Sequence, residues 1–248
     1  MNVGNILSRL NEISQSNLVS VYVPSAKKEM TFKPLSVKQQ KDLIKSGLDG
    51  ALGGVTISNV INQIIIDNST EKYEFLIIDK IPIILTLRMQ SFGPQVKIKE
   101  EDKEVEYNLQ EILSKNLEFT NTEKTTVSLG DSGVSVELEM ITLENDIKIN
   151  TFQLEKLRKN KQDELSDTVG SLFIYEILKF ISKLTVNVDE VDMKNTALKD
   201  RLTIVENIPA VLNNQILDYI QTFRKNEMDY ITVDGNTLPI DARLFSKE

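Results

Sequence analysis

Histidine, cysteine and tryptophan are absent from the chain. Without histidine there is no imidazole general base, no Ser-His-Asp triad and no histidine-ligated metal. Without cysteine there are no disulfides, no thiolate nucleophile and no cysteine-held zinc or iron–sulfur cluster. Any catalysis would depend on carboxylates, lysine, tyrosine, serine or Mg²⁺ held by oxygen atoms. The composition therefore indicates a protein that is not an enzyme and that carries no cofactor or metal.

Long hydrophobic runs are also missing. The longest apolar stretch is Ile81–Leu87, and it is interrupted by Pro82 and Thr86. It is much shorter than the roughly 20 residues that a helix needs to cross a bilayer. The first residues, Met1–Ser16, lack a cationic start followed by an apolar block, so we expect no signal peptide and no membrane partner.

The remaining composition is that of a soluble globular protein. Hydrophobic residues make up 40% and charged residues 27% of the 248 residues, which is enough for one large domain or two modest ones with a real core. The formal net charge is −8. Because an acidic protein repels phosphate groups over its surface as a whole, we expect no nucleic-acid partner.

A short amphipathic helix is predicted at the start of the chain. Its apolar residues Val3, Ile6, Leu7, Leu10 and Ile13 recur at a spacing that puts them on one face of a helix. This face either packs on the helix's own domain or forms an exposed arm that docks elsewhere. If the chain forms oligomers, the face is a candidate contact surface.

The rest of residues 1–94 predicts a β-hairpin followed by helices. The β-prone segments Leu18–Val23 and Glu29–Lys33 flank a polar connection, as in a hairpin. Ser36 followed by Gln39 is the pattern of a capping box at a helix start. Two further helices are predicted over Ile57–Asp67 and, with Asp79 as the N-cap, over Ile81–Arg88.

Residues 95–150 predict a small antiparallel β module. Polar and apolar residues alternate along Val96–Lys99, Thr126–Leu129 and Val134–Met140, as in half-buried strands. Gly130–Gly133 has the composition of a hairpin turn between the last two segments. The module would be inserted between an amino-terminal and a carboxy-terminal helical region.

Residues 151–248 predict a helical region with an extended tail. A wide apolar arc over Asp163–Leu184 favours one central buried helix. Helices are also predicted over Thr196–Val205 and from Pro209 onward, and the tail Tyr230–Phe245 is expected to be extended. The predicted fold class is therefore α+β, mainly helical, with an amino-terminal β-hairpin and a small antiparallel β module in the middle.

No catalytic motif emerges from the spacing of the polar residues. A Ser-x-x-Lys pattern occurs at Ser25–Lys28, but it falls in a predicted turn, whereas a serine nucleophile of that type needs a shielded helix start. Arg88 stands in an otherwise apolar helix. It contacts either a partner protein or an internal acid, because an arginine in such a helix must find a partner.

Three segments, Met30–Ile44, Ile78–Gly93 and Leu238–Phe245, resemble in that order the tailed-phage baseplate hub protein family, typified by the T-even hub subunit and hub assembly factor. Many members of that family place a cysteine-rich metal ribbon after the second segment, where this chain has Val96–Phe119 without cysteine. Many also end with two aromatic residues, where this chain has Leu244–Phe245. The chain departs from the family at these two places, and it is the departure in Val96–Phe119 that argues against a bound metal.

The resemblance implies a structural or assembly protein of a contractile phage tail, either a hub subunit or an assembly chaperone of the hub or tape-measure components. Its partners would be other tail proteins, and self-association is left open. It would act in the host cytoplasm during assembly and, if retained, in the virion baseplate. A Mg²⁺-dependent carboxylate enzyme and a nucleic-acid-associated structural protein are the alternatives. The candidate partner contacts are Leu7, Leu10, Arg88, Ile240 and Phe245.

Overall fold

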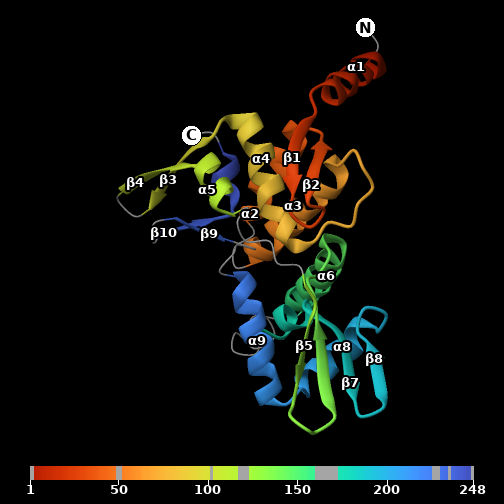
Figure 1. Ribbon diagram of the computed structural model, residues 1–248. Coiled ribbons are helices and arrows are strands. Elements are labelled where there is room, and N and C mark those ends of the chain that lie inside the picture. Colours follow the sequence, from red (N-terminus) through yellow and green to blue (C-terminus); the bar gives the residue numbers. More distant parts are fainter. Residues whose placement is uncertain are drawn as a thin grey trace.

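The computed structural model describes residues 3–48, 52–100, 103–116, 123–159, 173–224, 230–233 and 236–246. The fold is α+β and mainly helical, and it begins with a β-hairpin, so the predicted fold class is confirmed. Figure 1 shows a hairpin with helices at one end of the molecule and a four-stranded sheet at the other, with α6 (Leu143–Lys159) between them. One contiguous set of buried apolar side chains runs through both ends.

The amino-terminal helix α1 (Val3–Ser16) projects from this body, and a hairpin follows it (Figure 1). Strand β1 (Val19–Val23) pairs antiparallel with β2 (Lys28–Phe32), and Val21 lies opposite Met30. The inward side chains of both strands are buried, which places one face of the hairpin in the core. The hairpin predicted from the sequence is confirmed.

Helix α2 (Val37–Gly47) begins at the predicted capping box. The hydroxyl of Ser36 accepts a hydrogen bond from the amide of Gln39 at 3.2 Å, and the Ser36 amide donates to the Gln39 side chain at 2.9 Å. Two amide groups at the helix start are thereby satisfied reciprocally. Residues 49–51, which follow this helix, lie outside the described residues.

Three further helical elements pack behind the hairpin: α3 (Gly53–Asn68), the 3₁₀ turn η2 (Ile77–Asp79) and α4 (Lys80–Phe92). Helix α4 contacts β1, and most of its residues are buried. It ends at Gly93, which has φ of +83° and whose amide donates to the Met89 carbonyl oxygen at 2.8 Å. A glycine at this position ends the helix without steric cost.

A second hairpin and the carboxy-terminal tail lie on one side of this helical end (Figure 1). The hairpin and its helix are β3 (Gln95–Glu100), β4 (Lys103–Asn108) and α5 (Leu109–Asn116). The tail contains β9 (Tyr230–Val233), β10 (Asn236–Pro239) and the 3₁₀ turn η3 (Ala242–Phe245). The two tail strands pair with each other, and residues 234 and 235 between them lie outside the described residues.

The other end of the molecule is an antiparallel sheet with the strand order β5-β6-β7-β8. Its strands are β5 (Thr125–Ser128), β6 (Val134–Leu138), β7 (Ile181–Val186) and β8 (Asp189–Asp192). Helices α8 (Leu198–Glu206) and α9 (Ala210–Arg224) follow, as predicted, and α9 contacts β5. The predicted boundary at residue 150 falls inside helix α6, and strands from before and after that residue belong to this one sheet. The division into residues 1–94, 95–150 and 151–248 stays a prediction.

The helix predicted over Asp163–Leu184 is wrong at its carboxy-terminal end. Residues 173–178 are helical, but Ile181–Val186 form strand β7, and residues 160–172 lie outside the described residues. Strand β8 then lies between β7 and the helix predicted over Thr196–Val205. A continuous apolar run is compatible with a buried helix or a buried strand. Pairing with β6, which joins Val136 to Leu184, decides in favour of the strand.

Candidate protein-interaction surface

Several kinds of functional site are not found in the described part of the chain. No helix there is long and apolar enough to cross a membrane. Nor does that part gather three or more acidic side chains in a place where they could hold a metal ion. The open groove between α2 and α3, about 820 Å³ in volume, mixes Lys38, Lys45 and Arg158 with Asp42 and Asp67. Its lining therefore carries charges of both signs.

Arg88 is buried and holds the carboxy-terminal tail. Its side chain is 4% exposed, and its Nε donates to the Leu244 carbonyl oxygen at 3.0 Å. The guanidinium also donates to the carbonyl oxygen of Gly93 and lies 5.6 Å from the centre of the Phe92 ring. Burial lowers the pKa of Arg88. Its hydrogen bonds in the described residues go to backbone carbonyl groups and not to an internal acid.

The two other tail candidates are also internal. Ile240 is 7% exposed and Phe245 is fully buried. The Gln40 side-chain amide of α2 donates to the Phe245 carbonyl oxygen at 3.1 Å. Arg88, Ile240 and Phe245 therefore pack within the chain's own fold at the tail.

The three segments that carry the family resemblance meet at this tail. Gln40 belongs to the first segment, Arg88 to the second, and Leu244 and Phe245 to the third. These residues are far apart in the sequence. The fold joins them by two hydrogen bonds, from the Gln40 side chain to the Phe245 carbonyl oxygen and from the Arg88 side chain to the Leu244 carbonyl oxygen. The three segments thus meet in the folded body.

A second buried polar contact joins the hairpin to α4. Asp79 is fully buried and accepts hydrogen bonds from the Ser25 amide at 2.9 Å, the Ser25 hydroxyl at 2.5 Å and the Leu76 amide at 2.8 Å. Burial raises the pKa of Asp79 and outweighs these hydrogen bonds, which act in the opposite direction. Ser25 is therefore part of a structural hydrogen-bond network, in agreement with its place in a turn.

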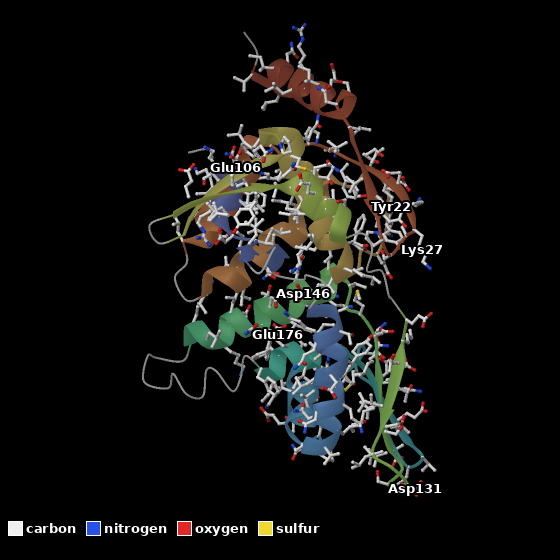
Figure 2. The ribbon with its side chains drawn as sticks, turned by 60° about the vertical axis from the view of Figure 1, so that its left-hand side comes forward. Tyr22, Lys27, Glu106, Asp131, Asp146 and Glu176 are labelled. Atoms are coloured by element: carbon white, nitrogen blue, oxygen red, sulfur yellow. The ribbon has the colours of Figure 1, made fainter. Side chains whose placement is uncertain are left out.

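A buried ion pair lies where the two ends of the molecule meet. Lys179 Nζ is 3.0 Å from the Asp146 carboxylate of α6 and 2.9 Å from that of Glu176. Asn62 of α3 and Asn150 each donate to the other Asp146 oxygen, at 2.7 and 3.2 Å. Figure 2 shows Asp146 and Glu176 in the middle of the molecule. The Asp146 carboxylate is engaged by a cation and two amides, which suits a structural joint.

Sequence reasoning missed this joint, although a signal was present. Asp146 and Asn150 are four residues apart, so they share one face of a helix. Asn62 stands among isoleucines in a helix that must be buried. Polar residues on apolar helix faces usually pair with one another when buried. The partner across the joint could not be read from the sequence, because Lys179 lies in the segment predicted as helix up to Leu184.

The exposed apolar face of α1 is the clearest interaction surface of the described residues. Figure 1 shows α1 extending away from the hairpin and helices. The exposed fractions of its apolar side chains are Val3 68%, Ile6 43%, Leu7 56%, Leu10 56% and Ile13 56%. Of the two expectations for this helix, the structure favours the exposed arm. Leu7 and Leu10 are accessible to a partner, in contrast to the tail candidates.

Local contacts define where this helix ends. The Ser16 hydroxyl and the Asn17 side-chain amide both donate to the Ile13 carbonyl oxygen, at 2.9 and 3.1 Å. Such side chains satisfy carbonyl groups that the last helical turn leaves open. Only Asn17 and Leu18 separate α1 from β1, so the helix is a short arm attached closely to the body.

These features describe an apolar helical arm on a body whose buried Arg88, Asp79 and Asp146 are held by hydrogen bonds and an ion pair. The chain belongs to the T4 bacteriophage base plate protein family, whose model matches residues 16–234. It is therefore a structural protein of the phage baseplate, a setting in which it contacts other tail proteins. The comparisons with curated proteins and with solved structures returned no match.

The matched residues cover most of the chain but leave out both ends. Helix α1 lies almost entirely before residue 16, and the tail segment Leu238–Phe245 lies after residue 234. The match thus identifies the body of the protein with the family. The role of α1 has to be argued from its own geometry.

Proposed function

We propose that the protein acts at the hub of a contractile-tail baseplate, as a hub subunit or as an assembly factor for hub or tape-measure components. It acts there through protein–protein contacts, in the host cytoplasm during assembly. The family of the chain supports a place in the baseplate. The resemblance of the three ordered segments to hub proteins supports the hub branch of that family.

The observation that carries this proposal is the solvent-exposed apolar face of α1. Five apolar side chains on one helix, each between 43% and 68% exposed, cost free energy in water unless a partner covers them. A soluble assembly protein gains from such a surface, because covering it drives association. A partner's contact with the apolar face of α1 therefore serves the function of the protein and is not needed to fold the body.

The experiment is co-purification of the tagged full-length chain from infected cells, with the bound proteins identified by mass spectrometry. We expect hub or tape-measure proteins in the wild-type sample and a marked loss of them in the double variant Leu7→Asp, Leu10→Asp. Asn5→Asp is the matched control, because it adds a carboxylate to an exposed position of the same helix. Recovery of no tail protein by the wild-type chain would contradict the proposal.

A second measurement separates a permanent subunit from a transient factor. Mass spectrometry of purified virions finds the chain if it stays in the hub, and finds it only in assembly intermediates if it acts as a chaperone. Both results agree with a hub role. Absence from virions and from intermediates would reject it.

A further inference from the structure

Several buried amide oxygens at the joint between α3 and α6 have no hydrogen-bond donor among the described residues. They are the side-chain oxygens of Asn59 and Asn62 on α3 and of Asn150 and Gln153 on α6. Asn62, Asn150 and Gln153 are 0%, 1% and 1% exposed. Leaving a buried acceptor unpaired destabilises a fold, so nearly all such atoms in folded proteins pair with a protein group or with ordered water. This concentration of unpaired acceptors at one contact therefore points to a bound ligand.

The orientation of two of these amides follows from the chemistry of Asp146. Asn62 and Asn150 each direct the amide nitrogen to the same Asp146 oxygen, at 2.7 and 3.2 Å. The other Asp146 oxygen lies 3.0 Å from Lys179 Nζ. A carboxylate that is paired with a lysine only accepts hydrogen bonds, so each amide must turn its nitrogen to Asp146 and its oxygen to another donor. Figure 2 shows Asp146 in the middle of the molecule.

The other two acceptors continue the same row along the contact. Asn59 precedes Asn62 by three residues on α3, and Gln153 follows Asn150 by three residues on α6, so each pair lies on one face of its helix. The Asn59 side-chain nitrogen donates to the Thr151 hydroxyl of α6 at 3.4 Å, which leaves its oxygen without a donor. The four oxygens therefore belong to one polar contact between the two helices.

The charges around this row favour a neutral ligand over a cation. Lys179 lies beside Asp146 and Glu176, and the buried Lys80 donates to the Ser58 hydroxyl of α3 at 3.1 Å. Two ammonium groups thus already balance two carboxylates. A further cation, held by uncharged amide oxygens, would add a buried positive charge that nothing compensates, and this is costly. A water molecule supplies the missing donors without adding charge.

We propose that these amide oxygens hold a small group of internal water molecules between α3 and α6. A water molecule donates two hydrogen bonds, so one molecule can join an oxygen of Asn62 on α3 to an oxygen of Asn150 or Gln153 on α6. An internal water typically makes about three hydrogen bonds to buried polar groups, and this row offers that many acceptors. The two ends of the molecule are then joined by bound water as well as by the Asp146–Lys179 ion pair.

The water is detected in the unmodified full chain by nuclear magnetic resonance, with nitrogen-15 in the asparagine and glutamine side chains. We expect magnetisation transfer between water and the side-chain amide protons of Asn62 and Asn150, with the sign that marks a long-lived contact and not proton exchange. Gln63 on the exposed side of α3 is the internal control and should show only fast surface hydration. Absence of long-lived water at Asn62 and Asn150 overturns the proposal.

The part played by the row is tested by removing one acceptor. Gln153→Met keeps the length of the side chain but has no amide oxygen, and we expect it to lose at least one long-lived water molecule relative to the wild-type chain. Oxygen-17 relaxation dispersion counts such molecules. Gln63→Met makes the same chemical change at an exposed position of α3 and should leave the number unchanged. An unchanged number in Gln153→Met contradicts the proposed site.

A monovalent cation is the other ligand that oxygen atoms could hold, and salt identity separates it from water. Thermal unfolding of the full chain is compared in sodium, potassium and N-methylglucamine chloride at one ionic strength. Bound water predicts the same midpoint in all three salts. A higher midpoint in sodium or potassium that Gln153→Met abolishes would show a cation site and overturn the water assignment. None of these measurements involves another tail protein, so their outcome is independent of the hub role.

Discussion

The Arg88 guanidinium donates a hydrogen bond to the carbonyl oxygen of Leu244, which lies 156 residues later in the chain. This contact ties the helix at the centre of the amino-terminal end to the last turn of the tail. Both partners are buried, so the bond is shielded from water and its loss would leave buried polar groups unpaired. The tail is therefore part of the folded body.

Replacing Arg88 by lysine tests this anchor. Lysine keeps the charge but cannot reproduce the fork of donors that reaches Leu244 and Gly93. We expect a loss of about 1.5–3 kcal/mol in the free energy of unfolding, and faster amide hydrogen exchange in the tail. The same change at the exposed Arg9 is the control and should stay within about 0.5 kcal/mol. Equal stability of Arg88→Lys and the wild-type protein would contradict the anchor.

The packing of the tail on α2 is tested at Gly47. A Cβ atom at this position would lie 2.5 Å from the Ala242 Cβ, which is closer than such atoms approach. Gly47→Ala must displace η3, and we expect a cost of about 1–3 kcal/mol in urea unfolding. Gly54→Ala is the control: no atom lies within 4 Å of its added Cβ, and alanine favours the helix by about 0.5–1 kcal/mol. We therefore expect Gly47→Ala to lower the free energy of unfolding and Gly54→Ala to raise it.

The joint between the two ends of the molecule is tested at Lys179. Lys179→Met leaves the buried Asp146 carboxylate without its cation, so we expect a loss of about 3–5 kcal/mol in the free energy of unfolding. Lys183→Met is the matched control, because Lys183 pairs with Glu190 at 3.2 Å on the exposed sheet. Breaking that pair should cost less than about 1 kcal/mol. Similar costs at both positions would show that the joint is not the stronger contact.

The stability of the sheet end at alkaline pH is tested at Tyr219. Burial, together with the negative charge of Glu139, raises the pKa of Tyr219 to about 12 from the ordinary 10.0. Because the folded pKa is the higher one, the neutral phenol stabilises the fold fully below pH 10, and this contribution is lost as the pH rises through about 12. Measured by urea unfolding, the Tyr219→Phe variant should therefore lose less stability than the wild-type protein between pH 10 and 12. If the free energy of unfolding falls equally with pH in both proteins, the Tyr219 phenol does not make this contribution.

Much of the amino-terminal end could be predicted because its signals are local. The capping box at Ser36 depends on two side chains three residues apart, and the hairpin before it depends on neighbouring strands. The start of α4 after Asp79 and its end at Gly93 follow from the preferences of proline and glycine. Such signals act within one or two turns and survive in the folded protein.

The strand β7 could not be predicted for the opposite reason. Its apolar residues satisfy a helical arc as well as a strand, and the partner strand β6 lies more than 40 residues earlier. The same holds for the candidate contacts. Leu7 and Leu10 on one side, and Ile240 and Phe245 on the other, are equally apolar in sequence, yet the first pair is exposed and the second buried.

The sequence by itself determined that the chain has no histidine or cysteine, the helical period of α1 and the order of the three segments that carry the family resemblance. These follow from residue type and spacing, which are known without a structure. Only the tertiary structure decided that the three segments meet at Arg88, that Asp146 pairs with Lys179, and that α1 is exposed. Burial and long-range pairing depend on the whole chain, because each is a contact between residues that the sequence keeps far apart.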